Sequence, residues 1–465
     1  MAGAFPKAMS PTAATNGAQQ PISNEEAVNY VLLSAHEHDV KFIRLWFTDI
    51  LGTLKGFAIT VDDLEEVMRN GASFDGASIE GLARTDESDM IAMPDPATWQ
   101  LLPWRPKANA VARMFCDIRT PDGRAAAACS REALRRNLRR SADMGFTFYT
   151  APEIEYFYLK APDSPEALDK GGYFDQSAAD TAGPDLRRDT VLALEDMGIP
   201  VKHSHHEVAP GQHEIVLRHT NALTMADAVV TFRVVAKEIA AQHGVYASFM
   251  PRPFNNRHGS GMHTHMSLFR GDENAFYDPD VEMHLSQTGR QFIAGLIRHA
   301  GEITAMTNQW VNSYKRLVPG YEAPVFASWT SGNWGDLIRV PAYRTGREGG
   351  IRVEYRAPDA ACNPYLAFSA MLAAGLDGIE KGYPLPEPIA GSIARLSEAE
   401  LAERGVSRLP STLDEAIRAA EGSDLLNRSL GPAVLDSFLH NKRIEWRDYT
   451  RAVTDYEIAR YLPQL

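Results

Sequence analysis

A pair of glutamates inside a short apolar segment is the feature that most constrains this chain. Residues 150–157 read Thr-Ala-Pro-Glu-Ile-Glu-Tyr-Phe, and aromatic and β-branched residues at this density predict a strand. Side chains alternate between the two faces of a strand, so Glu153 and Glu155 are expected on one face. Two like charges side by side repel each other and are costly to bury.

A second segment adds two more carboxylates. Residues 203–214 place Glu207 and Glu214 on either side of a Pro-Gly turn. Four carboxylates that converge need cations between them, and hard divalent ions such as Mg²⁺ or Mn²⁺ prefer oxygen ligands. The sequence therefore predicts a metal site that contains Glu153, Glu155, Glu207 and Glu214.

Two further predicted strands repeat the polar pattern at alternate positions. Residues 262–267 put His263, His265 and Ser267 on one face, and residues 351–356 do the same for the three charged side chains Arg352, Glu354 and Arg356. The His-x-His pair alone could suit zinc, but its carboxylate-rich company favours a harder ion.

Two arginines have a bland and a functional interpretation. Arg316 precedes a Pro-Gly turn and could be a surface arginine, while Arg356 could simply pair with Glu354. The functional alternative is that both arginines hold a carboxylate substrate through paired hydrogen bonds.

Size and composition limit the class of protein. The chain has 465 residues, a net charge of −13 and three cysteines. An acidic chain is a poor general binder of nucleic acid, and few cysteines without a CxxC pair favour a reducing cytoplasm. No stretch approaches the roughly 20 apolar residues of a membrane span. We expect a flexible tail over residues 1–22 and domains over residues 23–125 and 126–465.

The pattern of apolar residues and turn signals predicts the main elements. The basic helix at 130–144 is interpreted as presenting its arginines to solvent. The other predictions are a hairpin over 40–61, a loop over 74–81, and helices over 224–243, 284–308 and 363–382.

Five motifs together resemble one known family. They are Phe-Asp-Gly-Ala-Ser-Ile-Glu-Gly at 74–81, His-His-Glu-Val-Ala-Pro-Gly-Gln-His-Glu at 205–214, Gly-Ser-Gly-Met-His-Thr-His at 259–265, Asn-Ser-Tyr-Lys-Arg-Leu-Val-Pro-Gly-Tyr-Glu-Ala-Pro at 312–324 and Asn-Pro-Tyr-Leu at 363–366. In this order they resemble bacterial type I glutamine synthetase. The resemblance implies an α+β fold with a small β-grasp N-terminal domain and a catalytic domain built on a curved antiparallel sheet. It also implies a dodecamer with active sites shared between subunits.

The resemblance assigns roles residue by residue. The implied activity is ATP-dependent ligation of ammonia to the γ-carboxylate of L-glutamate through γ-glutamyl phosphate, with two or more Mg²⁺ or Mn²⁺ ions per site. One ion would be held by Glu155, Glu207 and Glu214, and the second by Glu153, His263 and Glu354. Glutamate would contact Gly259, Arg316, Glu322 and Arg356, and the nucleotide would contact His205, His265, Ser267, Arg339 and Arg352. Asp75 from a neighbouring subunit and Glu322 on a flap would take the proton of ammonium, with Arg339 as a further catalytic residue.

The sequence departs from the family pattern at several positions. Trp334 stands where an arginine is usual, His258 replaces an asparagine, and Lys202 replaces a glutamate near the nucleotide. The tyrosine that some members have adenylylated is absent from residues 392–396. Two alternatives therefore stay open: a γ-glutamyl ligase for a polyamine or other primary amine, and a non-catalytic assembly protein that keeps the fold.

Overall fold

The computed structural model describes residues 24–81, 88–176, 183–332, 335–343, 345–389, 393 and 396–465. The predicted tail, Trp334 and most of the stretch 392–396 lie outside these residues. The described chain forms two compact units: the first contains residues 24–79, 88–132 and 150–249, and the second contains residues 80–81, 133–149 and 250–465. The domain boundary near residue 125 stays a prediction.

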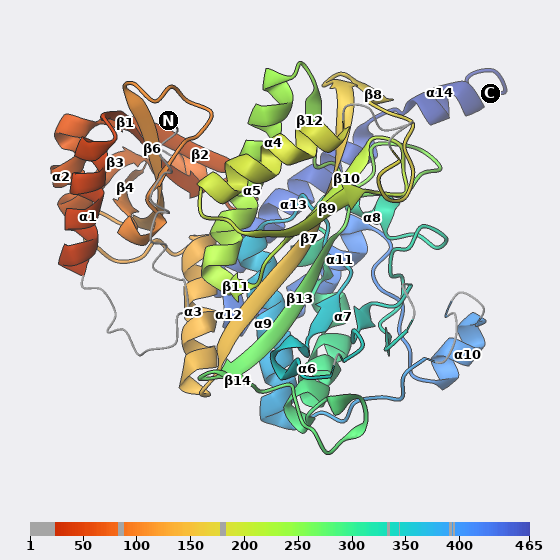
Figure 1. Cartoon of the computed structure of the whole chain (residues 1–465). Coiled ribbons are helices and arrows are strands. Elements are labelled where there is room, and N and C mark those ends of the chain that lie inside the picture. Colours follow the sequence, from red (N-terminus) through yellow and green to blue (C-terminus); the bar gives the residue numbers. More distant parts are fainter. Residues whose placement is uncertain are drawn as a thin grey trace. The chain divides into compact units, whose positions relative to one another are not determined.

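The N-terminal part of the first unit is a mixed sheet with helices packed on it (Figure 1). The predicted hairpin is confirmed as β1 and β2, which pair antiparallel, while β6 runs parallel to β1. Buried side chains such as Ile43, Leu45 and Met114 fill its core. The predicted loop at 74–81 is partly wrong, because Phe74 and Asp75 pair with β4. The strand order is β2-β1-β6-β4-β3, with β5 beside β6, and the elements are α1 (Asn24–Glu37), β1 (Val40–Thr48), β2 (Leu54–Thr60), α2 (Leu64–Asn70), β3 (Ala72–Asp75), β4 (Asp89–Pro94), β5 (Gln100–Leu101) and β6 (Ala110–Arg119).

The rest of the first unit is an antiparallel sheet with two helices against it. Strand β10 lies between β7 and β9, and α4 and α5 pack against these strands and β12 (Figure 1). Helix α5, predicted at 224–243, starts where the Asn221 side chain accepts a hydrogen bond from Thr224 N, which satisfies a free N–H of the first turn. The elements are β7 (Thr147–Ala161), β8 (Ser164–Ala167), α4 (Gly183–Asp196), β9 (Val201–His206), β10 (Gln212–Leu217), β11 (Thr220–Asn221), α5 (Ala222–Gln242) and β12 (Tyr246–Ser248).

The second unit combines short strands with a helical core. Strand β17 lies between β13 and β16, and α9 packs against α6, α7 and α12. Asn363 caps the start of α9, and Gly382 in the left-handed conformation ends it, so the helix predicted over 363–382 is confirmed. The elements are β13 (Met262–Arg270), β14 (Glu273–Asn274), α6 (Gln287–Arg298), α7 (Ala300–Thr307), α8 (Ser313–Arg316), β15 (Trp329–Thr330), β16 (Ile338–Arg339), β17 (Val353–Tyr355), α9 (Pro364–Lys381), α10 (Glu398–Glu403), α11 (Leu413–Glu421), α12 (Asp424–Leu430), α13 (Pro432–Arg451) and α14 (Asp455–Tyr461).

Two predicted elements differ in the structure. The helix expected over 284–308 is broken at His299, whose ring bonds Glu302 on one side and Asp377 on the other. The strand expected over 351–356 is only the three residues of β17, so Arg352 and Arg356 flank the strand instead of lying in it.

The basic helix is α3 (Ser130–Asp143), and its predicted role is wrong for Arg131. The Arg131 side chain is 4 % exposed and pairs with three carboxylates, those of Asp95, Asp117 and Asp227. Burial alone would lower the pKa of Arg131, but these carboxylates outweigh it and raise that pKa well above its usual value. The arginine ties α3, α5 and the N-terminal sheet together, because a buried charge must be paired.

Candidate functional site

In the first unit, three strands bring the predicted metal ligands together. Glu155 on β7 lies directly opposite Glu214 on β10, and Glu214 lies directly opposite His205 on β9. Directly paired residues share a face, so Glu155, Glu214 and His205 lie on one face of the sheet. Glu155 and Glu214 each offer a carboxylate oxygen within 4.8 Å of the other, and Gln212 Nε2 donates to Glu155 Oε2 at 3.0 Å.

Glu207 ends the row at the turn between β9 and β10. Burial raises the pKa of its carboxyl to about 9, and the charges of Glu155 and Glu214 add to this rise. Burial likewise raises the pKa of Glu214 to about 7, with further contributions from Glu153 and Glu155. These shifts are the electrostatic cost of gathering carboxylates where water is scarce.

His205 partly offsets that cost. Its Nε2 lies 3.1 Å from Glu214 Oε1, and its Nδ1 lies 3.6 Å from Glu207 Oε1. Burial alone would lower the pKa of His205, but the bond to Glu214 and the nearby carboxylates raise it to about 9. A proton on this ring gives one positive charge against several carboxylates. A divalent cation fits the donor set better, since it supplies two charges and accepts several oxygen ligands.

The second unit also contains a cross-strand row of predicted site residues. Arg339 on β16, Glu354 on β17 and His265 on β13 lie directly opposite one another. Glu354 is fully buried, and Arg339 Nε donates to its Oε2 at 2.7 Å. Arg356 bonds the other carboxylate oxygen, so the plain ion pair is present. His263 Nδ1 lies 3.9 Å from Glu354 Oε1, which is compatible with a shared ion.

The structure also places His265 beside Arg352, whose Nε donates to His265 Nδ1 at 3.2 Å. Ser267 is buried two residues further along β13. Four residues predicted to lie along a nucleotide are in this unit. Three of them, His265, Ser267 and Arg352, are neighbours on or beside one strand, and the fourth, Arg339, lies on β16.

Arg316 is not a surface arginine, because it is only 3 % exposed. Its guanidinium donates to the backbone carbonyls of Ala357, Arg356 and Pro358. Glycine lets the loop backbone pack directly against this arginine: a Cβ on Gly261 would lie 2.6 Å from Arg316 Nη2, and one on Gly259 would lie 3.1 Å from Arg316 Cγ.

Two predicted proton acceptors lie at exposed positions of separate units. Asp75 ends β3 in the first unit, where its Oδ1 accepts a hydrogen bond from Ala77 N at 2.9 Å. Glu322 in the second unit is exposed and has a φ of +54°, a strained value for a residue other than glycine. Strain of this kind gathers at ligand clamps and switch segments.

Several side chains that lie beside the site were not predicted from the sequence. Tyr173 and Phe174 expose their rings, and both rings pack against His205. Asp169 was also missed, although it contacts two histidines beside the ligands. Asp169, Tyr173 and Phe174 lie in a segment rich in Ser, Pro, Asp and Gly, a composition that predicts only a loop. No local pattern marks these residues as part of a site.

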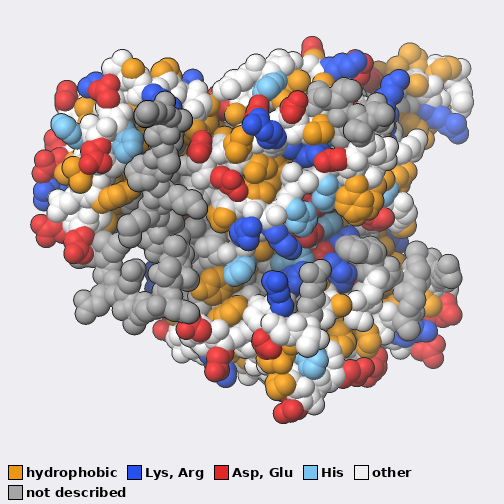
Figure 2. Space-filling model, in the orientation of Figure 1, with side chains coloured by type: hydrophobic (Ala, Val, Ile, Leu, Met, Phe, Trp, Pro, Cys, Tyr) orange, Lys and Arg blue, Asp and Glu red, His pale blue; other side chains and the backbone are white. Residues whose placement is uncertain are grey.

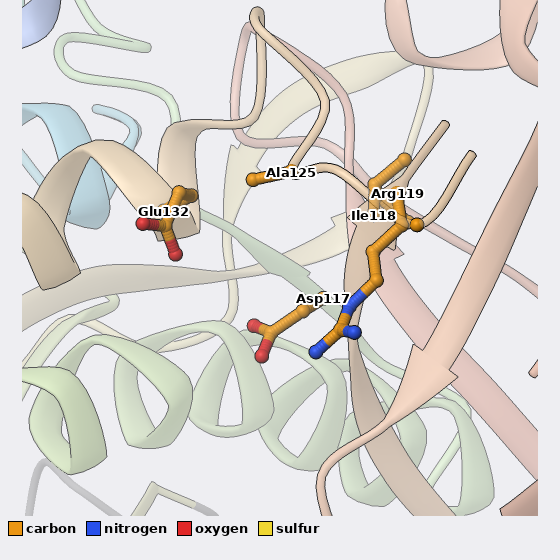
Figure 3. Close-up of a pocket in the computed structure, with 6 residues that line it drawn as sticks. Asp117, Ile118, Arg119, Ala125 and Glu132 are labelled. Carbon is orange, nitrogen blue, oxygen red and sulfur yellow. The ribbon is translucent and has the colours of Figure 1, made fainter. Parts of the chain in front are cut away.

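A separate pocket of about 230 Å³ contains none of the predicted site residues. Figure 3 shows Asp117 and Arg119 extending from β6 toward the same space, with Glu132 at the start of α3 across from them. Asp117 already pairs with Arg131, and none of the residues that line this pocket belongs to the row of Glu155, Glu214 and His205.

Comparison with known proteins decides the family. Residues 127–461 match the family described as Glutamine synthetase, catalytic domain, and residues 39–121 match Glutamine synthetase, beta-Grasp domain. The chain belongs to the glutamine synthetase family. Its predicted α+β fold, with a β-grasp N-terminal domain and a glutamine synthetase catalytic domain, is confirmed.

Relatives cover nearly the whole chain. A protein named Glutamine synthetase from Mycolicibacterium smegmatis is 52 % identical over 93 % of this chain and 98 % of its own length. One of the same name from Methanosarcina mazei is 48 % identical over 94 % and 97 %. A solved structure titled "GmaS/ADP complex-Conformation 1" has a TM-score of 0.83 and 31 % identity, covering 93 % of this chain and 99 % of its own. The chain is therefore an enzyme of this ligase family.

None of the described helices is long and apolar enough to cross a membrane. On the visible face of the N-terminal sheet region, acidic side chains are scattered among basic ones (Figure 2). The cytoplasmic location and the lack of a nucleic-acid partner stay predictions from composition.

Proposed function

We propose that the protein joins ammonia to the γ-carboxylate of L-glutamate at the expense of ATP, giving L-glutamine, ADP and phosphate. The observation that carries this proposal is the row of Glu155, Glu214 and His205, in which both glutamates are buried, with Glu207 at its end. The names of the relatives agree with it, and a related structure is titled as an ADP complex.

Each predicted site residue has a proposed role in this reaction. Glu155, Glu207 and Glu214 would hold one Mg²⁺ or Mn²⁺ ion, and Glu153, His263 and Glu354 a second. Bound divalent ions neutralise phosphate charge and orient the transferred phosphoryl group. Arg316, Arg356 and the backbone of Gly259 would hold glutamate. His205, His265, Ser267, Arg339 and Arg352 would line the nucleotide.

The reaction balances in two steps. A γ-carboxylate oxygen of glutamate attacks the γ-phosphorus of ATP, and the bond to the ADP oxygen breaks. Ammonium loses a proton to Asp75 or Glu322, and the resulting nitrogen lone pair attacks the acyl carbon of γ-glutamyl phosphate. The attached nitrogen then loses a second proton to the other of these two carboxylates. The carbon–oxygen bond then breaks and phosphate leaves. Water must be excluded meanwhile, which is the role proposed for the segment around Glu322.

The assembly is part of the same proposal. Asp75 is exposed on a strand end, which suits a residue that completes the site of a neighbouring subunit. We propose a homo-oligomer, with a dodecamer as the specific form. Light scattering coupled to size-exclusion chromatography of the full chain would measure the mass directly.

A product assay tests the function. Purified protein is incubated with Mg–ATP, L-glutamate and ¹⁵N-ammonium or one of a panel of primary amines, and products are read by mass spectrometry and phosphate release. The proposal predicts ¹⁵N-glutamine as the main product. A γ-glutamyl-amine without glutamine would favour the amine-ligase alternative, and ion binding without turnover on any acceptor would favour the assembly protein. The variant Glu207→Gln should lose turnover, while Glu65→Gln, at an exposed glutamate of α2, should not.

A further inference from the structure

A second polar cluster lies on the opposite face of the hairpin β9–β10. His206 and His213 are directly opposite each other in the two strands, and both rings are fully buried. Because faces alternate along a strand, they point away from the face that carries His205 and Glu214. The third member is Asp169, which follows β8 and has a side chain only 4 % exposed.

One oxygen of Asp169 collects several donors. His206 Nε2 lies 2.9 Å from Asp169 Oδ1, and the backbone N–H groups of Gly211 and Gly171 donate to the same oxygen at 2.8 and 3.2 Å. The other oxygen, Oδ2, lies 3.3 Å from His213 Nε2. One carboxylate thus contacts the last residue of β9, the turn, and a residue of β10.

The spacing of these ligand atoms, all within 4.8 Å of one another, would also admit a metal ion. The donors argue against this. Arg187 Nη1 lies 2.7 Å from His213 Nδ1, and a guanidinium can only donate, so Nδ1 accepts and the proton of this ring is on Nε2. His206 Nδ1 lies 2.6 Å from the Glu207 carbonyl oxygen, so both nitrogens of that ring face oxygen acceptors. His213 Nε2 therefore has no lone pair left for a metal ion, and His206 Nε2 already faces a carboxylate oxygen of Asp169.

We propose that Asp169 is a positioning residue that fixes the turn between the two glutamates of the hairpin. This inference rests on the proposed role of Glu207 and Glu214 as metal ligands. Asp169 orients the His206 ring, which holds the Glu207 carbonyl, and it also holds Gly211 N at the far side of the turn. The turn is closed as well by Glu207 N donating to Gln212 O at 2.8 Å. The two carboxylates therefore keep their separation before an ion arrives, which is the usual work of residues behind metal ligands.

The residues around the His206 ring are closely packed. A Cβ on Gly171 would lie 2.6 Å from His206 Nε2. Arg187 is also held on its far side by Asp175, whose Oδ1 accepts from His206 N at 3.1 Å.

Metal binding by the full-length protein tests the proposal. Asp169→Asn keeps the shape of the side chain but replaces one acceptor oxygen with a donor group. Metal-free wild type and variant are titrated with Mn²⁺, and free Mn²⁺ is read by electron paramagnetic resonance. We expect the dissociation constant to rise about 10-fold or more in the variant, as is typical when the support of a ligand is removed. In the turnover assay, the Mn²⁺ concentration for half activity should rise while kcat at saturating Mn²⁺ recovers most of its value.

Asp49→Asn is the matched control. Asp49 is also a buried aspartate that accepts backbone N–H bonds in a hairpin turn, here between β1 and β2, from Leu51 and Thr53. The Asp49→Asn substitution should lower the free energy of unfolding without changing the Mn²⁺ dissociation constant. If Asp169→Asn does not fold, Gly171→Ala displaces the same His206 ring and should weaken Mn²⁺ binding in the same way.

An unchanged Mn²⁺ dissociation constant in folded Asp169→Asn and Gly171→Ala would overturn the proposal. So would a Zn²⁺ ion that wild type binds and Asp169→Asn loses, because the histidines would then be ligands. A different result would contradict the proposed function itself. In that case the Mn²⁺ dissociation constant of Glu207→Gln would equal that of wild type.

Discussion

Replacing Glu207 with glutamine in the metal-free protein should stabilise the fold, although it removes a proposed metal ligand. Burial and the charges of Glu155 and Glu214 raise the pKa of Glu207 from 4.5 to about 9. A carboxyl with a raised folded-state pKa contributes stability that is fully present below pH 4.5 and lost as the pH rises toward 9. The metal-free wild type should therefore become less stable between pH 5 and pH 9.

The size of the effect follows from the same shift. One pKa unit corresponds to about 1.4 kcal/mol, so at pH 7.5, three units above the ordinary value, the cost is at most about 4 kcal/mol. Glutamine does not ionise, so Glu207→Gln escapes this cost. We expect its free energy of unfolding to exceed that of wild type at pH 7.5 in EDTA, and the two to be similar at pH 5.

Urea denaturation at pH 5, 6.5, 7.5 and 8.5 measures this, first in EDTA and then with Mn²⁺. Added Mn²⁺ should stabilise the wild type strongly and Glu207→Gln weakly, so the order of stability reverses. Glu65→Gln, at an exposed glutamate paired with Arg69, is the control and should follow wild type throughout. A metal-free Glu207→Gln that is less stable than wild type at pH 7.5 would refute the reasoning.

Three further predictions concern other parts of the chain. Arg131→Met should lower the free energy of unfolding by about 3–5 kcal/mol in urea denaturation, because it removes the buried guanidinium that three carboxylates share; a loss below 1 kcal/mol would mean that water reaches them. Gly259→Ala should raise the KM for glutamate about 10- to 100-fold in steady-state kinetics, since its Cβ would lie 2.3 Å from Pro251 O and shift the loop; an unchanged KM would exclude this loop from the glutamate site. Glu322→Ala should reduce glutamine formation about 10²- to 10⁴-fold while calorimetry still detects ATP binding, and normal turnover would contradict its role as a proton acceptor.

The local part of the site was predictable from sequence. The i, i+2 spacing of Glu153 and Glu155 places both on one strand face, and that inference needs no knowledge of the partner strands. Arg316 was a candidate from its place before a Pro-Gly turn, but no local pattern indicates its burial under the carbonyls of 356–358. What the sequence could not give is register: nothing in the segment 203–214 specifies that Glu214 lies opposite Glu155 rather than one residue away.

The errors have one physical origin, which is tertiary pairing of charge. Arg131 looked like one of several solvent-facing arginines because its three aspartate partners are 14 to 96 residues away in sequence. Asp169 was missed because its histidine partners are on two other strands. Helical periodicity across His299 predicted one continuous helix, and the bonds of that ring to Glu302 and Asp377 accompany its break.

Anomalous diffraction from crystals grown with Mn²⁺ and a non-hydrolysable ATP analogue would locate the bound ions. We expect an anomalous peak within about 2.5 Å of carboxylate oxygens of Glu155, Glu207 and Glu214, a distance typical of such ions. Mn²⁺ peaks elsewhere, with these three carboxylates bonded only to protein or water, would contradict it.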